Sequence, residues 1–316
     1  MKFAHIVLGI AISAGIIGAL LPEAKSVPEK VVSVGYQKYG NLILLKGRGE
    51  LESKLAALGF RVEWKEFPSG PPLLEALNAG AIDFGHAGET PPIFAQAAGI
   101  PFVYVAYEPP SPQGEAVMVR AGSPLETLAD LKGKKIALNK GSNVHYLLVR
   151  ALEHAGIKYS EIEPIYLAPA DARAAFERGA VDAWVIWDPF RAAVEAAAGA
   201  RTLADGSGLA PNRQFYLAGR AFAQKNPVAV DAIVAAISDI DRWAVNQQKA
   251  AAAQISAGIG VPASVVEIAL KRQAYGVRVL DAETIADQQQ IADTFRGLGL
   301  LPKSLVVSAA QWNRMP

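Results

Sequence analysis

The chain has 316 residues, of which 51% are apolar and 19% charged, and it contains no cysteine. This composition is typical of a globular protein with a well-buried core, and the length suits about two domains of ~100–200 residues each. The net charge of +1 gives no basic excess, so we expect no nucleic-acid partner. The lack of cysteine excludes disulfides, thiolate metal sites, cysteine nucleophiles and a lipid-anchored amino-terminal cysteine.

Residues 1–26 have the features of a signal peptide. Lys2 precedes an apolar stretch without formal charge, from Phe3 to Leu21. Ala24-Lys25-Ser26 then places small residues at the two positions that a signal peptidase recognises, which predicts cleavage after Ser26. The alternative is an uncleaved membrane anchor, since a run of this length is just enough to span a bilayer. We expect an exported, periplasmic protein.

From residue 31 onward, short apolar runs alternate with stretches of helical spacing. This alternation predicts an α/β fold with two mainly parallel sheets flanked by helices. The expected strands are 31–35, 61–67, 81–84, 102–107, 116–120, 134–138, 162–167, 181–187 and 214–217. The run at 102–107 is apolar throughout, so we expect it in the centre of its sheet. From Pro227 onward the pattern is mostly helical and is expected to pack against the first lobe.

Helix starts are predicted where a capping residue precedes an apolar stretch of helical spacing. Thr90 stands before Pro91 and Asp188 before Pro189, and proline is favoured in the first turn of a helix. Asp171 is expected to cap a third helix, which ends at a glycine. A short helix is expected over 125–131.

Two segments repeat one pattern at a constant offset. Residues 79–91 and 178–190 each contain a helix-ending glycine, a short strand and a capping residue followed by proline. Asp83 corresponds to Asp182 (182 − 83 = 99), and Glu89 corresponds to Asp188 at the same offset. The repeat predicts two similar lobes that face each other across a cleft. We expect the lobes to comprise residues 27–112 with 216–316, and residues 113–215.

Four junctions, each between a strand and the following helix, are the best candidates for a binding site. In α/β sheets, ligands bind outside the carboxyl ends of the strands. Helix amino termini there offer unpaired N–H groups and a partial positive charge, so several aimed at one point form an anion site. The junctions are 36–41, 86–91, 140–145 and 187–189. The candidate ligand contacts are Gln37, Gly88, Thr90, Ser142, Asn143 and His145, with Trp187 as a wall of the cleft.

These residues also have simpler interpretations. Thr90, Ser142 and Asp188 can serve only as N-caps, worth about 1 kcal/mol each. Glu89 and Asp188 would repel an anion unless they point away, so they suit the far end of a ligand that bears an amine or hydroxyl. The competing hypothesis is an exported enzyme in which these two carboxylates form an acid–base pair. No Ser-His-Asp order, metal-ligand spacing or phosphate loop accompanies them, so we expect no catalysis, no metal and no cofactor.

Five segments together resemble the periplasmic solute-binding proteins of ABC importers for aliphatic sulfonates. These segments are 35–38, 69–80, 91–99, 139–148 and 183–190, and they cover most of residues 31–220. The resemblance implies a two-lobed type II binding-protein fold that closes around an organosulfonate. It further implies delivery to a membrane permease for sulfur uptake, no catalysis, and a monomer. Ligand contact is implied at Gln37, Gly88, Thr90, Ser142, Asn143, His145 and Trp187, and at Glu89 and Asp188.

Two positions depart from the pattern expected of that family. Thr90 follows Glu89 where alanine is frequent after the acid, and Asn143 stands where a second serine is frequent. Both positions touch the expected pocket, so a same-fold binder of taurine, nitrate or a thiamine-precursor pyrimidine stays open. The organic part of the ligand is expected against Trp187 and Tyr36.

Overall fold

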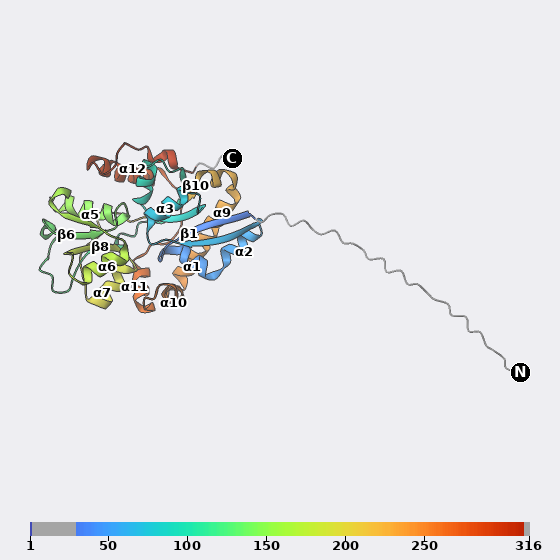
Figure 1. The fold of residues 1–316 in the computed structure, drawn as a ribbon, viewed down its shortest axis with the longest axis horizontal. Coiled ribbons are helices and arrows are strands. Elements are labelled where there is room, and N and C mark those ends of the chain that lie inside the picture. Colours follow the sequence, from blue (N-terminus) through green and yellow to red (C-terminus); the bar gives the residue numbers. More distant parts are fainter. Residues whose placement is uncertain (2–29, 313–316) are drawn as a thin grey trace.

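The computed structural model describes residue 1 and residues 30–312, so the expected signal peptide lies outside the described residues apart from Met1. Two five-stranded sheets, each flanked by helices, form two neighbouring halves of the molecule (Figure 1). The predicted α/β fold with two mainly parallel sheets is confirmed.

The first sheet has the strand order β2-β1-β3-β10-β4. β1 runs parallel to β2 and β3, whereas β10 is antiparallel to both of its neighbours. The strands are β1 (Lys30–Tyr36), β2 (Phe60–Glu66), β3 (Phe84–Gly88), β4 (Phe102–Tyr107) and β10 (Gln214–Gly219). The helices between them are α1 (Gly40–Arg48), α2 (Glu50–Ala56), α3 (Gly70–Asn78) and α4 (Pro91–Ala97).

The second sheet has the corresponding order β7-β6-β8-β5-β9, and its fourth strand is again the antiparallel one. Its strands are β5 (Glu115–Val119), β6 (Lys135–Leu138), β7 (Glu163–Tyr166), β8 (Ala183–Trp187) and β9 (Arg201–Asp205). Its helices are α5 (Asn143–His154), α6 (Pro169–Glu177) and α7 (Phe190–Ala198). β9 was not predicted, because its residues are half-buried and mostly polar.

The sequence repeat corresponds to a structural one. β3 begins at Phe84 and β8 at Ala183, which gives the same offset (183 − 84 = 99). The carboxylate of Asp83 accepts a hydrogen bond from Ser33 N, and that of Asp182 accepts one from Lys135 N, both at 2.8 Å. Each aspartate therefore fastens its strand to the adjacent parallel strand.

Three local predictions were wrong. The strand expected at 81–84 instead runs from Phe84 to Gly88, because Asp83 is used in the turn that precedes it. The helix α6 begins at Pro169, so Asp171 lies in its first turn and does not cap it. The helix expected over 125–131 is a short 3-10 turn, Leu128–Leu131.

The apolar strand β4 lies at the edge of its sheet, not in the centre as predicted. It is nevertheless buried along its whole length. Tyr107 exchanges two backbone hydrogen bonds with Arg278, and Tyr104 O accepts one from Trp312 N at 3.0 Å. Segments of the carboxy-terminal third therefore cover this edge.

The carboxy-terminal third is helical. It comprises α8 (Arg220–Lys225), α9 (Pro227–Asn246), α10 (Gln248–Ile259), α11 (Ala263–Arg272), α12 (Ala282–Gly297) and a 3-10 turn, Val307–Ala310. α9 and α10 pack against α1 of the first half as expected, but α11 also packs against α7 of the second half. Within residues 30–312 no single helix has the length and apolar composition to cross a membrane; α10 and α11 pass that test only as a pair, bent by 117°.

The two equivalent aspartates should differ in their contribution to stability. Asp83→Ala leaves the partly buried Ser33 N–H without an acceptor and should lower the free energy of unfolding by about 1–2 kcal/mol. Asp182→Ala is the matched variant at a more exposed bond, where water replaces the carboxylate, and should cost about 0.5 kcal/mol. Urea denaturation of both variants measures the difference. Equal losses of stability in the two variants would show that the difference in burial between the two hydrogen bonds has no effect.

Candidate binding site between the two sheets

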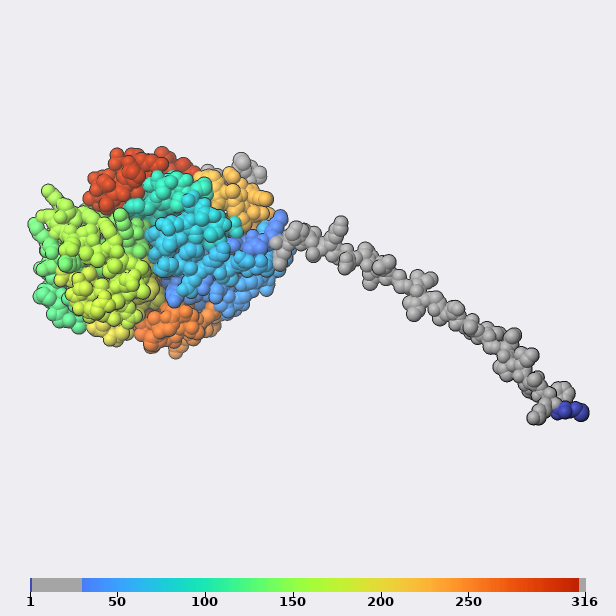
Figure 2. Space-filling view, in the orientation of Figure 1, coloured from blue at the N-terminus to red at the C-terminus, as the bar shows by residue number. Residues whose placement is uncertain are grey.

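A pocket lies where the two sheets, their connecting segments and the helices α10 and α11 meet. Its residues from the first half are Lys38, Tyr39, Gly40, Gly88 and Glu108, and those from the second half are Gly114, Asn143, Trp187, Asp188 and Pro189. The connectors contribute Ser111, Asn212 and Arg213, and β10 contributes Gln214. The carboxy-terminal segment contributes Ile255, Val266, Ala269, Leu270, Gln273 and Ala274. In the space-filling view the orange α10–α11 segment lies where the two halves meet (Figure 2).

Four of the nine predicted contacts line this pocket, namely Gly88, Asn143, Trp187 and Asp188. Gly88 and Asn143 lie next to each other in its wall. A Cβ added at Gly88 would lie 2.7 Å from Asn143 Oδ1. The side chain of Asn143 donates to Glu115 Oε2 at 2.6 Å and to Asn212 Oδ1 at 2.7 Å. The Trp187 indole Nε1 is buried and has no hydrogen-bond partner among the described residues.

The other five predicted contacts are buried but do not line the pocket. Three of them form hydrogen bonds with residues in or next to the strand-to-helix junctions. The amide of Gln37 donates to His86 O at 2.9 Å, and Ser142 Oγ donates to Asn139 O at 2.7 Å. His145 Nδ1 accepts from Gly141 N at 3.2 Å. Burial and then the charge of Lys140 lower the pKa of His145 to about 4, so this ring is neutral at pH 7.

Glu89 and Thr90 are the remaining two predicted contacts. The carboxylate of Glu89 accepts N–H groups of Asn212 at 3.2 Å and Arg213 at 2.9 Å, and so ties the end of β3 to the connector. Thr90 stands at the N-cap of α4, but its hydroxyl makes no capping bond and has no partner within residues 30–312. Ser142 at the start of α5 also makes no side-chain capping bond. The start of α5 therefore keeps N–H groups that no capping side chain occupies. The start of α4 does not, because Pro91 and Pro92 have no N–H and Ile93 N donates to Thr90 O at 3.0 Å.

Glu115 is a buried acid near the pocket that the sequence analysis missed. Burial raises its pKa well above the ordinary value, and the nearby charge of Glu89 raises it further. Burial also raises the pKa of Glu89 to about 7, against the lowering effect of its bonds to Arg213 and Asn212. Burial therefore favours the neutral form of Glu115, whose carboxyl carries a hydroxyl that can donate a hydrogen bond. The only sequence signal was a single acid at the start of an apolar run.

Tyr39, and not Tyr36, is the aromatic residue that lines the pocket beside Trp187. The two ring centroids are 6.4 Å apart. Tyr36 instead packs on Trp64 and donates to Glu66 Oε2 at 3.1 Å. Tyr36 is the last residue of β1, and Tyr39 lies three residues beyond it. Which of the two side chains faces the pocket depends on where the strand ends, and the sequence pattern did not predict that residue.

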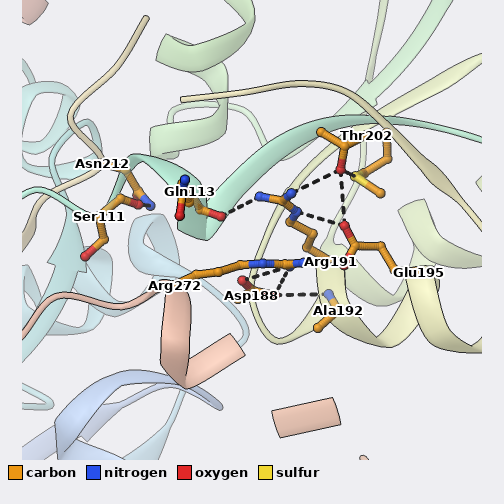
Figure 3. A network of polar contacts seen from close by, with 10 residues as sticks. Ser111, Gln113, Asp188, Arg191, Ala192, Glu195, Thr202, Asn212 and Arg272 are labelled. Atoms are coloured by element: carbon orange, nitrogen blue, oxygen red, sulfur yellow. Dashed lines mark hydrogen bonds and ion pairs between the residues drawn. The ribbon is translucent and has the colours of Figure 1, made fainter. Parts of the chain in front are cut away.

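Asp188 belongs to a network that joins the carboxy-terminal helices to the second half (Figure 3). Arg272, at the end of α11, lies 3.3 Å from Asp188 Oδ2 and 2.7 Å from Glu195 Oε2. Asp188 Oδ1 also accepts from Ala192 N at 3.0 Å. The prediction that Asp188 is the N-cap was wrong by one residue, because α7 begins at Phe190 and Pro189 is its N-cap. Arg191 continues the network to Glu195 and to Thr202 Oγ1, both at 3.1 Å. No group of three metal-ligating side chains that could hold an ion occurs in residues 30–312.

Comparison with known proteins places this arrangement in a family. Residues 28–260 match the NMT1-like family. The chain belongs to this family. Two solved structures share its fold along nearly their whole length and are more than two-fifths identical to it in sequence.

One is the alkanesulfonate-binding protein SsuA from Xanthomonas axonopodis pv. citri bound to MOPS, with 41% identity, a TM-score of 0.85, and coverage of 89% of this chain and 98% of that one. The other is the periplasmic aliphatic sulphonate binding protein SsuA from Escherichia coli, with 42% identity, a TM-score of 0.81, and coverage of 90% and 97%. The taurine-binding periplasmic protein of Escherichia coli K12 is 31% identical over 183 residues, 57% of each chain. All three are named as binding proteins.

The Arg272 network of this NMT1-like protein should contribute to stability. Arg272→Gln leaves the largely buried Asp188 carboxylate without its cation and should lower the free energy of unfolding by about 2 kcal/mol. Arg173→Gln removes an exposed ion pair with Glu177 and should cost at most about 0.5 kcal/mol. Denaturant titration of the two variants compares them. A loss at Arg272 no larger than at Arg173 would show that the network contributes little.

Glu89 should make stability depend on pH. The folded protein holds a proton on Glu89 up to about pH 7, whereas the ordinary pKa is 4.5. This contribution is therefore fully present below pH 4.5 and is lost as the pH rises to 7. Glu89→Gln should reduce the decline over this range by on the order of 3 kcal/mol. Urea unfolding at pH 4.5 and 7.5 measures it.

Glu75→Gln, on the exposed face of α3, is the control for the change of net charge. If the two variants show the same difference in stability between the two pH values, the buried carboxyl of Glu89 does not cause the decline.

Proposed function

We propose that this protein captures an aliphatic sulfonate in the periplasm and delivers it to the permease of an ABC importer for sulfur uptake. The observation that carries the proposal is the pocket between the two sheets, in a chain 41–42% identical to two sulfonate-binding proteins over nearly its whole length. The division into lobes 27–112 with 216–316 and 113–215 is part of the proposal. The membership of the two sheets supports it, with β10 beginning at Gln214.

The sulfonate oxygens are proposed to bind where the end of β3, the start of α5 and the end of β8 border the pocket. A buried donor supports this position, because the indole N–H of Trp187 lines the pocket and lacks a partner among the described residues. The hydroxyl of Thr90 also lacks a partner, but Thr90 does not line the pocket. The raised pKa of Glu115 favours its neutral form, which would not repel an anion as an ionised acid does. The direct contacts are assigned to Gly88, Asn143 and Trp187, while Gln37, Ser142, His145 and Glu89 shape the junctions from behind.

The protein is proposed to act as a monomeric binding protein and not as an enzyme. The alternative needs Glu89 and Asp188 to work as a pair. Each is engaged elsewhere: Glu89 accepts backbone N–H groups of the connector, and Asp188 pairs with Arg272. The relatives are also named as binding proteins.

Calorimetry with ethanesulfonate, taurine, sulfate and nitrate tests the ligand. We expect a sulfonate to bind with a Kd below ~100 μM and to stabilise the protein by about 2.7 kcal/mol at a hundred times its Kd, which a thermal shift detects. Tightest binding of nitrate, or no binding of any sulfonate, would contradict the proposal. Recovery of the unchanged ligand after long incubation tests the absence of catalysis.

Gly88→Ala tests the position of the site. The added methyl group would lie 2.7 Å from Asn143 Oδ1, so we expect sulfonate affinity to fall at least about tenfold. Gly219→Ala is the matched control at the end of β10, where the nearest atom to the new Cβ is at 3.8 Å. Affinity should be unchanged in Gly219→Ala, and equal affinities in the two variants would move the site elsewhere.

A further inference from the structure

Two buried acids meet beside α1 in the first half of the molecule. Glu108 begins the first connector between the two halves, residues 108–114, and Asp241 lies in α9. Each residue is only 2% exposed. The side-chain amide of Asn41, in α1, donates to Glu108 Oε1 at 2.8 Å and also to Asp241 Oδ1. The two carboxyls therefore share one donor, and they also form a hydrogen bond with each other.

A hydrogen bond between two carboxyls requires a proton on one of them, because an ionised carboxylate can only accept. The other oxygen of Glu108 supports this requirement. Glu108 Oε2 is buried and has no partner among the donors of the described residues. A buried ionised oxygen without a donor is costly, whereas a hydroxyl at this atom needs none. The geometry therefore fits a pair that holds one proton and one negative charge.

The titratable groups that face the pair are neutral. Tyr216 of β10 donates to Glu108 Oε1 at 2.6 Å, and burial raises its pKa well above the ordinary value. Tyr275, in the segment between α11 and α12, also has a raised pKa, through burial and then the charge of Asp241. His86 stacks on Tyr216 with 6.4 Å between ring centroids, and burial lowers its pKa to about 4. These three groups therefore keep their charge state between pH 6 and 9.

The cations nearby are paired with other acids. Lys38 and Arg213 line the pocket that Glu108 also borders, and each forms an ion pair elsewhere, at 3.5 and 2.7 Å respectively. Within residues 30–312, neither Glu108 nor Asp241 forms an ion pair with a basic side chain. A second negative charge in the pair would therefore have no cation to compensate it, and two like charges in one buried site repel each other strongly.

The pair connects parts of the chain that are far apart in sequence. Asp241 Oδ2 accepts the N–H groups of Gly276 and Val277, both at 2.9 Å, in the segment between α11 and α12. The same segment is bonded to the first connector, because Ala274 N donates to Ser111 Oγ at 2.8 Å. The two acids therefore lie where the first connector, α9 and the α11–α12 segment are joined.

Burial and then the charge of Asp241 raise the pKa of Glu108 to about 8. Burial also raises the pKa of Asp241, against the lowering effect of its bonds to Gly276 and Val277. Because the ordinary pKa of a glutamate is 4.5, the stabilisation that depends on the proton is fully present below pH 4.5 and is lost as the pH rises through about 8.

We propose that Glu108 and Asp241 share one proton and form a pH-sensitive joint, which holds the first connector against α9 and the α11–α12 segment and loosens when the proton is lost. The connector links the two halves, so the joint lies on the hinge side of the molecule. This inference goes beyond the proposed function, and its tests use no ligand.

Carbon NMR of the side-chain carboxyls between pH 6 and 9.5 tests the shared proton. We expect the resonances of Glu108 and Asp241 to shift together in one step near pH 8. In Glu108→Gln the amide takes the place of the protonated carboxyl, so Asp241 should show no step in this range. Absence of a step in the unmodified protein would overturn the proposal.

Hydrogen–deuterium exchange tests the joint. A peptide that covers residues 273–278 has the same sequence in the unmodified protein and in Glu108→Gln, so the ratio of the two exchange rates removes the intrinsic effect of pH. We expect rates within about twofold at pH 6.5, and exchange at least about fivefold faster in the unmodified protein at pH 9. Equal rates at both pH values would show that loss of the proton does not open the joint, and would contradict the proposal.

Asp241→Asn is the contrasting variant. It places an N–H₂ group among the donors of Asn41, Gly276 and Val277, so it should speed exchange of the same peptide at both pH values. Glu75→Gln, on the exposed face of α3, is the control for net charge and should behave like the unmodified protein. Thermal melting verifies that each variant is folded.

The comparison of variants separates a joint controlled by a proton from an ordinary buried contact. If Glu108→Gln speeds exchange at pH 6.5 as much as Asp241→Asn does, the pair is only a structural contact and the proposal fails. None of these outcomes depends on which ligand the protein binds, so failure of the joint leaves the proposed function untouched.

Discussion

The buried carboxylate of Glu89 is the constraint on which the pocket depends. It sits at the end of β3 and accepts N–H groups of Asn212 and Arg213, while Gln288 of α12 donates to Glu89 O at 2.9 Å. One residue thus ties together the first sheet, the connector and the carboxy-terminal helices. Asn212 in turn accepts from Asn143 at the start of α5. Because buried polar groups must be paired, this chain of bonds fixes how the junctions of the two halves face each other.

The same burial bears on how acids can stand beside the proposed anion site. An ionised carboxylate would repel a sulfonate, and the sequence analysis therefore placed Glu89 at the far end of the ligand. In the structure, burial raises the pKa of both Glu89 and Glu115; the charge of Glu89 raises that of Glu115 further, and the charge of Asp287 raises that of Glu89. A protonated carboxyl changes from a repelling charge into a donor. The acids are compatible with the anion because they are buried together, which no single position in the sequence reveals.

The scaffold could be predicted because it repeats locally. The offset between Asp83 and Asp182 identified two equivalent sheets, and both aspartates fasten neighbouring strands in the same way. Features that depend on distant segments could not be predicted. β4 looked central because it is apolar, but residues near Arg278 and Trp312 bury it at an edge. Glu115, Tyr39 and Arg272 escaped notice for the same reason: each acquires its role only from partners far along the chain.

The helix α11 links the two properties that a binding protein must combine. Its inner face borders the pocket, and its end forms ion pairs with α7 of the second half. Val266 lines the pocket and Arg272 of the same helix pairs with Asp188 and Glu195, so one short helix shapes the pocket wall and ties the two halves together. A change that displaces α11 should therefore alter both the pocket and the contact between the halves.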